Sequence, residues 1–183
     1  MTVWFSSDHH FYHKNIIKHC NRPFDTMEEM HETMIKNWNS VVEPKQTVFY
    51  LGDFTFSNNL EEIEGLLSRL NGKIFLIKGN HDSNLVRKLL RIKQNLYEKF
   101  LNVEWYHCTT LQSQGKNYDV VMMHFPIETW EKKHYDSIHC HGHVHNRNPN
   151  PITAKNRYNV GVDVNDYTPI SFDSIVRELC LRN

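Results

Sequence analysis

The segment "HCHGHVH" (residues 139–145) places four histidines within seven residues. Neutral imidazole is the commonest metal ligand among side chains, and it is costly to bury unless each ring nitrogen has a partner. Two explanations compete. The segment is either a loose chelating run or a set of alternate residues aimed from a strand end into a site that distant segments complete. The second explanation requires ligand-type residues elsewhere in the chain.

Such residues follow predicted strands along the whole chain. Short β-branched and aromatic runs predict six strands, at Thr2–Ser6, Thr47–Leu51, Lys73–Lys78, Asp119–Met123, Ser137–Cys140 and Tyr158–Val160. The first five lead into the segments SSDHH, LGDF, KGNHD, MMHFP and HGHVH. Because an α/β sheet exposes its ligand-binding edge at the carboxyl ends of its strands, we expect these segments to meet.

Helical patterns alternate with the strands. A start of capping-box character at Asp25–Glu29 precedes an amphipathic stripe that runs from Met27 to Val41. Further helices are predicted over Leu60–Leu70, over Leu85–Leu96 after a cap at Asp82 or Ser83, and from Ser171 to Leu181. This alternation predicts a single α/β domain over residues 1–183, with one or two sheets inside helical layers.

The composition narrows the class of protein. Lys plus Arg and Asp plus Glu number 21 each, so the formal net charge is zero, which argues against a protein that binds mainly by neutralising a phosphate backbone. The cysteines, Cys20, Cys108, Cys140 and Cys180, form no CxxC pair. We therefore expect reduced thiols in a cytoplasmic protein rather than disulfides or a cysteine-type zinc module. No membrane span or signal peptide is readable.

The order of the polar segments resembles that of a known family. Asp-x-His, Gly-Asp, Gly-Asn-His-Asp, a lone His and Gly-His-x-His occur between Asp8 and His145, as in the calcineurin-like metallophosphoesterases. This resemblance implies two mixed β-sheets packed face to face as a sandwich with flanking helices, over essentially the whole chain. It places a metal site at the carboxyl ends of the strands.

The resemblance also implies a binuclear metal centre. One ion would be held by Asp8, His10, Asp53 and His145, and the second by Asp53, Asn80, His124 and His143. Asp53 would bridge the two ions. His81 would be the catalytic residue, facing the phosphate and its leaving oxygen rather than binding metal. We expect two Mn²⁺ ions per chain, since the mixture of carboxylate, amide and imidazole suits Mn, Fe, Zn or Ni.

The spacing of the motifs agrees with this ligand set. In an extended segment, Asp-x-His and His-x-His place alternate side chains on the same side, so His143 and His145 could each reach one of two neighbouring ions. His139 and His141 are either supporting partners of the ligands or ordinary strand residues. Asp82 either orients His81 or caps the following helix.

Three further residues are candidates for substrate contact. His9 and His13 flank the first motif, and Arg22 lies between Asn21 and Pro23 in a turn-like stretch where a guanidinium could bind an anion. The nearby Lys14 and Lys18 are equally well explained by a solvated helix face.

Together these features predict a metal-dependent phosphoesterase. Its substrate would be a small phosphomonoester or phosphodiester, preferably a nucleotide, hydrolysed through attack by a metal-activated hydroxide. A DNA or RNA nuclease is the alternative, but the compact, charge-balanced chain leaves little room for a long basic groove. A non-catalytic scaffold is a third hypothesis, against which the full ligand set and His81 argue.

Overall fold

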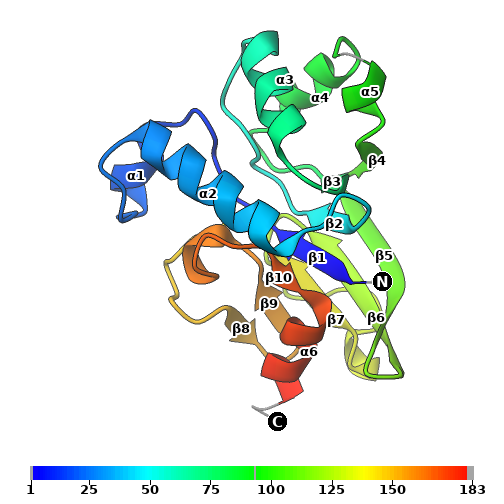
Figure 1. Cartoon of the computed structure of the whole chain (residues 1–183). Coiled ribbons are helices and arrows are strands. Elements are labelled where there is room, and N and C mark those ends of the chain that lie inside the picture. Colours follow the sequence, from blue (N-terminus) through cyan, green and yellow to red (C-terminus); the bar gives the residue numbers. More distant parts are fainter. Residues whose placement is uncertain (1, 93, 181–183) are drawn as a thin grey trace.

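Two mixed five-stranded sheets form the centre of the molecule (Figure 1). The computed structural model describes residues 2–92 and 94–180. The first sheet has the order β10-β1-β2-β3-β4, in which β1 to β4 run parallel and β10 is antiparallel to β1. Its strands are β1 (Val3–Ser6), β2 (Thr47–Tyr50), β3 (Lys73–Ile77), β4 (Phe100–Glu104) and β10 (Ile170–Ser171).

The second sheet has the order β5-β6-β7-β9-β8. Strands β6, β7 and β9 are parallel, and the outer strands β5 and β8 are antiparallel to their neighbours. The strands are β5 (Tyr106–Ser113), β6 (Lys116–Met123), β7 (Ile138–His141), β8 (Ile152–Ala154) and β9 (Arg157–Asn159).

Helices cover the outside of this sandwich (Figure 1). Six α-helices occur in the described residues: α1 (Ile16–His19), α2 (Met27–Val41), α3 (Leu60–Arg69), α4 (Ser83–Leu89), α5 (Gln94–Tyr97) and α6 (Phe172–Cys180). Short 3₁₀ turns lie at Lys133–Tyr135 and Val162–Val164. None of the helices in this part of the chain has the length and apolar character needed to cross a bilayer.

Two apolar clusters hold these layers together. In the first, the α2 stripe of Met30, Met34 and Trp38, all 0% exposed, packs with residues of α3, α4 and one face of the first sheet. In the second, Phe5 and other residues of the opposite face meet the second sheet and α6. Burial of the α2 stripe confirms its prediction as core packing. Thr26 accepts a hydrogen bond from the Glu29 amide at the start of α2, as the sequence predicts.

The predicted elements differ from the structure in three places. The helix predicted over Leu85–Leu96 is interrupted, because the chain turns after α4 through a hydrogen bond from Arg91 N to Lys88 O (2.8 Å). Five further elements were not predicted from the sequence because they are short or lie at sheet edges: α1, β4, β5, β8 and β10. The last helix begins at Phe172, and its predicted end at Leu181 lies outside the described residues.

The parallel strands bring their carboxyl ends to one edge of each sheet. Ser6 pairs with Tyr50 at the ends of β1 and β2, and β3 continues the same parallel register. In the second sheet, the ends of β6 and β7 lie side by side at Met122 and Cys140. The segments that follow these strands carry all the predicted metal ligands.

Candidate metal centre

Ligand-type side chains meet in three groups in the part of the chain that the structure describes. Two of them, called the two ligand groups below, contain six of the seven predicted ligand residues: Asp8, His10 and His145 in one, and Asp53, His124 and His143 in the other. The third joins Cys20 and Asp163 to His145. In each group the candidate ligand atoms, one from each residue, lie within 4.8 Å of one another.

Asp53 lies where the two groups join. Its Oδ2 atom is 3.6 Å from Nε2 of His10, in the first group, and 3.4 Å from Nε2 of His124, in the second. The seventh predicted ligand, Asn80, belongs to the second group, because its Oδ1 lies 3.1 Å from Nε2 of His124. The structure thus brings all seven residues together, with a carboxylate oxygen of Asp53 facing both groups.

The ring nitrogens of these histidines are arranged in a way that suits divalent ions. Nε2 of His10 is buried without a hydrogen-bond partner, which is costly for a polar atom unless it binds something. Nδ1 of His124 bonds the Leu51 carbonyl at 2.7 Å, and Nδ1 of His145 bonds Asp163 at 2.7 Å. Such bonds from one ring nitrogen leave the other to bind a metal.

Five of the seven predicted ligand residues have a left-handed backbone. The φ angles are 60° at Asp8, 54° at His10, 58° at Asp53, 70° at His143 and 49° at His145. Positive φ costs energy in non-glycine residues and is concentrated at functional sites. The prediction that Asp-x-His and His-x-His lie in extended segments is therefore wrong. Sharp turns beyond the strand ends, rather than the alternation of side chains along a strand, bring these residues together.

Glycines allow the loops to approach one another. A Cβ atom on Gly142 would clash with Asp8 Oδ2 and Ser7 Oγ, and one on Gly79 would clash with the carboxylate of Asp53. These two positions therefore require the absence of a side chain. The Gly-His-x-His and Gly-Asn-His-Asp motifs begin with glycine for this steric reason.

The carboxylates of the centre favour positive charge at two of its histidines. Burial alone would lower the pKa of His124, but its hydrogen bond to Asp53 and the nearby carboxylates outweigh burial and raise the pKa to about 9. The bond to Asp163 likewise outweighs burial at His145 and raises its pKa to about 10. Burial instead lowers the pKa of His10, to about 2, and that of His143, which keeps these two rings neutral, the form in which imidazole binds metal.

Asp82 fixes the loop that carries Asp53. Its carboxylate accepts hydrogen bonds from the main-chain amides of Asp53 (2.8 Å), Phe54 (2.9 Å) and Gly79 (2.8 Å). It makes no side-chain cap on α4. Neither role considered from the sequence is therefore the observed one, since Asp82 links the second and third motifs through their backbones.

Arg22 and His9 depart from their predicted role as substrate contacts. The Arg22 side chain is 0% exposed and pairs with Asp163, and its remaining donors bond the carbonyls of Asp8 (2.7 Å) and His9 (2.8 Å). His9 is 0% exposed, with Nδ1 3.0 Å from the Tyr50 hydroxyl. Both side chains are buried inside the protein, so neither is accessible to an anionic substrate.

His13 remains beside the centre. Its ring stacks on Phe56 with centroids 4.0 Å apart, and its Nδ1 lies 3.4 Å from Nδ1 of His10. It is only partly buried, so a substrate contact stays a prediction for this residue.

Asp163 is a residue of the site that the sequence reading missed. Its side chain is 0% exposed and bonds both His145 (2.7 Å) and Arg22 (2.8 Å). An available signal was its position three residues after the predicted strand Tyr158–Val160. The other site segments follow strands in the same way.

His139 and His141 prove to be strand residues of β7. Nδ1 of His139 lies 3.2 Å from the Val121 carbonyl, and Nε2 of His141 lies 2.9 Å from the Thr153 hydroxyl. Both side chains are buried and bonded away from the two ligand groups. Of the four histidines in residues 139–145, His143 and His145 alone join those groups.

His81 lies at the mouth of the centre. Its amide donates to Asp53 Oδ1 at 2.9 Å, while its exposed ring lies 4.6 Å from the Phe56 ring and 5.9 Å from the His10 ring. The backbone is thus anchored to the predicted bridging carboxylate, and the ring is open to solvent.

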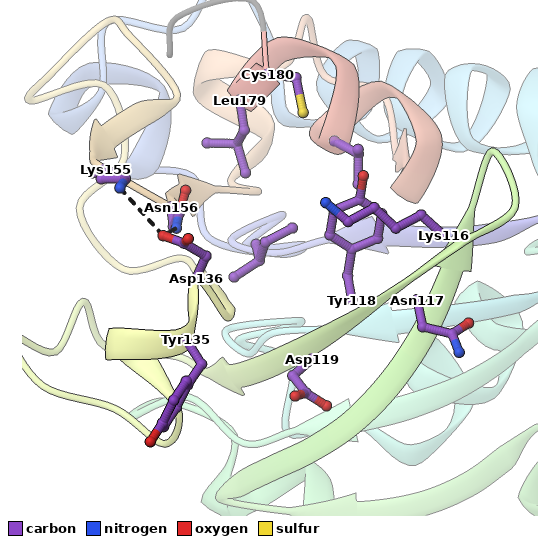
Figure 2. Close-up of a pocket in the computed structure, with 12 residues that line it drawn as sticks. Lys116, Asn117, Tyr118, Asp119, Tyr135, Asp136, Lys155, Asn156, Leu179 and Cys180 are labelled. Atoms are coloured by element: carbon purple, nitrogen blue, oxygen red, sulfur yellow. Dashed lines mark hydrogen bonds and ion pairs between the residues drawn. The ribbon is translucent and has the colours of Figure 1, made fainter.

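A separate hollow of about 750 Å³ lies between β6, the segment before β7 and α6 (Figure 2). Its lining includes Lys116, Tyr118, Asp119 and Tyr135, together with an ion pair between Lys155 and Asp136 (3.3 Å). None of the predicted site residues lines it. We therefore assign no part of the metal centre to this hollow.

The family model for calcineurin-like phosphoesterases matches residues 1–164. The chain belongs to this family. Members are in general metal-dependent phosphoesterases, and the resemblance seen in the motifs is confirmed.

Relatives from distant organisms share most of the chain. "Uncharacterized protein MJ1445" of Methanocaldococcus jannaschii is 37% identical over 180 residues, 96% of this chain and 89% of that protein. "Gene 66 protein" of Mycobacterium phage L5 is 29% identical over 160 residues, 78% of this chain and 77% of that protein.

A solved structure confirms the predicted fold class. The crystal structure of AQ665 from Aquifex aeolicus, described as a protein of unknown function, superposes with a TM-score of 0.70 at 27% identity. The match covers 97% of this chain and 98% of that one.

Proposed function

We propose that the protein is a binuclear metal-dependent phosphoesterase that hydrolyses a small phosphomonoester or phosphodiester, preferably a nucleotide, in the cytoplasm. The observation that carries the proposal is the position of Asp53, whose Oδ2 lies within 3.6 Å of histidines from both ligand groups. A carboxylate oxygen shared in this way is suited to bridge two cations. Family membership supports phosphoester hydrolysis in general.

The proposed ligands divide between two sites. Asp8, His10, Asp53 and His145 would hold one ion, and Asp53, Asn80, His124 and His143 the other, with Mn²⁺ the expected metal. Two bound divalent ions would supply Lewis acidity toward a phosphoryl oxygen and lower the pKa of a nearby water.

The protein itself contributes a proton donor and a rigid frame. His81 is anchored through its amide to Asp53, and its exposed ring is suited to protonate a leaving alkoxide or to bond a non-bridging oxygen as charge develops. Phe56 packs against the rings of His13 and His81, which limits the orientations that the His81 ring can adopt. Asp82 and Asp163 hold the surrounding loops and His145 in place.

Replacing the bridging carboxylate tests the proposal directly. Asp53→Asn preserves the shape of the side chain, and asparagine tolerates the left-handed backbone at this position. The charge that both cations would share is lost. We expect the variant to remain folded while hydrolysis by the Mn²⁺-loaded protein falls to background.

Elemental analysis and a substrate screen would complete this test. The parent should hold two Mn²⁺ ions per chain after free metal is removed, and should hydrolyse nitrophenyl mono- or diesters or nucleotides. A parent that never holds more than one ion, or an Asp53→Asn variant with parental turnover at saturating metal, would refute the binuclear assignment.

A further inference from the structure

A groove of about 330 Å³ runs beside α4, outside the two ligand groups. It is lined by three cationic side chains and two neutral amides, all of which can donate hydrogen bonds: Asn58, Asn84, Arg87, Lys88 and Arg91. No carboxylate among the described residues contributes to the lining.

The groove is lined by residues close along the chain to the proposed proton donor. Asn84 follows His81 by three residues, at the start of α4. Asn58 follows Phe56 by two residues, and the Phe56 ring lies 4.6 Å from that of His81. At about 1.5 Å of rise per helical residue, the wall from Asn84 to Lys88 extends about 6 Å along α4. Three residues of chain span at most about 11 Å, so a ligand held at His81 needs to extend by about that length to reach Asn84 and the groove.

The cationic groups of the groove form no ion pair with the acidic side chains that the structure describes. Within residues 2–92 and 94–180, the ion pairs include none made by Arg87, Lys88 or Arg91. The Arg87 guanidinium donates to a neutral side-chain oxygen, that of Asn84. In a chain with zero net charge, this cluster is a local positive site.

We propose that this groove binds a phosphate of the substrate other than the one being hydrolysed. The inference rests on the proposed function, because that function places the scissile phosphate beside His81. Guanidinium groups bind phosphate through paired N–H donors, and the two asparagines add neutral donors. The substrate class is therefore one with at least two phosphates, and nucleoside polyphosphates and short oligonucleotides share this chemistry.

The double variant Arg87→Gln/Arg91→Gln tests the groove in the metal-loaded protein. Lys45→Gln/Lys73→Gln is the matched control: it also removes two exposed positive charges, at the amino-terminal ends of β2 and β3, the opposite edge of the sheet. Equilibrium binding and hydrolysis would be measured for nitrophenyl phosphate, bis-nitrophenyl phosphate, ATP and oligothymidylate. Both variants should bind Mn²⁺ like the parent.

The groove variant should bind ATP or oligothymidylate about tenfold or more weakly than the parent, and bind both nitrophenyl esters unchanged. The logarithmic salt dependence of oligothymidylate binding should fall by about 1.4, which is about 0.7 for each lost contact on a single strand. The control should match the parent throughout. A loss confined to ATP assigns a nucleoside polyphosphate, and one confined to oligothymidylate assigns a nucleic acid strand.

Three results would overturn the inference: an unchanged affinity for both multi-phosphate ligands, an equal loss for the single-phosphate esters, or a parent that binds all four ligands equally. The binding measurements test the groove, and the hydrolysis measurements test the proposed function, so the two proposals can be refuted independently. Absent hydrolysis of every ester would refute the proposed function, while the binding comparison would still decide whether the groove holds phosphate.

Discussion

Asp163 accepts a hydrogen bond from Nδ1 of His145, with Oδ2 2.7 Å from the ring nitrogen. This bond holds the ring of His145 beside Asp8 and His10, with which it forms one of the two ligand groups. The same carboxylate pairs with the buried Arg22, which bonds the carbonyls of Asp8 and His9. A single buried carboxylate therefore links the last motif to the backbone of the first.

Replacing Asp163 should weaken metal binding although the residue is not among the proposed ligands. Asp163→Asn keeps an acceptor for His145 and Arg22 but removes the charge that orients the imidazole and increases its basicity. We expect metal affinity to fall about 10- to 100-fold, the range found for such supporting carboxylates. Titration with Mn²⁺ measures the effect. Asp166→Asn, an exposed neighbour, is the control and should leave affinity unchanged; equal affinities in both variants would contradict the role.

The predicted ligand residues, which the structure brings together, could be picked out from the sequence because each motif is local. The spacings of Asp8 and His10, Asn80 and His81, and His143 and His145 are visible within a few residues, and each follows an apolar strand. The order of these motifs along the chain also predicted the two-sheet fold, because it resembles that of the calcineurin-like metallophosphoesterases.

The roles of Arg22 and His9 could not be read in this way. The partner of Arg22, Asp163, lies 141 positions away in the chain, and no local pattern indicates that pairing. Burial of His9 likewise depends on Tyr50 and Trp38, from other elements. The left-handed turns at the ligands were also unpredicted, because non-glycine residues adopt them only when surrounding contacts enforce them.

His81→Ala should separate metal binding from proton transfer. We expect the variant to keep both metals, because Asn80 rather than His81 contacts the second ligand group. Turnover should fall by roughly the 10²–10⁴-fold that a positioned proton-transfer group contributes. The loss should be small for nitrophenyl esters, whose leaving group needs little protonation, and large for alkyl or nucleoside esters.

Metal analysis and rates on both ester types would check the two claims about His81 separately. Loss of metal would make His81 a ligand. An equal rate loss for acidic and basic leaving groups would assign it to phosphate binding instead.

Two glycine substitutions should have opposite effects on stability. Gly142→Ala places a methyl group against Asp8 and Ser7, and overpacking of this kind typically costs about 1–3 kcal/mol. Because Asp8 must then move, Mn²⁺ affinity should fall as well. Gly65→Ala, in α3, meets nothing within 4 Å and should stabilise the protein by up to about 1 kcal/mol. Urea unfolding and metal titration measure both; a Gly142→Ala variant with parental stability and affinity would show that the loops do not need this close approach.

His139 should make the protein less stable in acid. Burial lowers the pKa of His139 to about 4 despite its bonds to the Val121 and Phe125 carbonyls, whereas an unfolded histidine has a pKa of about 6.5. Below about pH 6.5 the unfolded chain therefore binds a proton that the folded chain does not. The contribution of His139 to stability is complete above that pH and declines by about 1.4 kcal/mol per pH unit as the pH falls toward 4. His139→Gln should flatten the fall in unfolding free energy between pH 7 and pH 5 by about 2 kcal/mol, and the exposed His134→Gln should not. Urea titrations of the metal-free proteins across this range decide the matter, since parallel curves for the parent and His139→Gln would mean that His139 takes up its proton equally in both states.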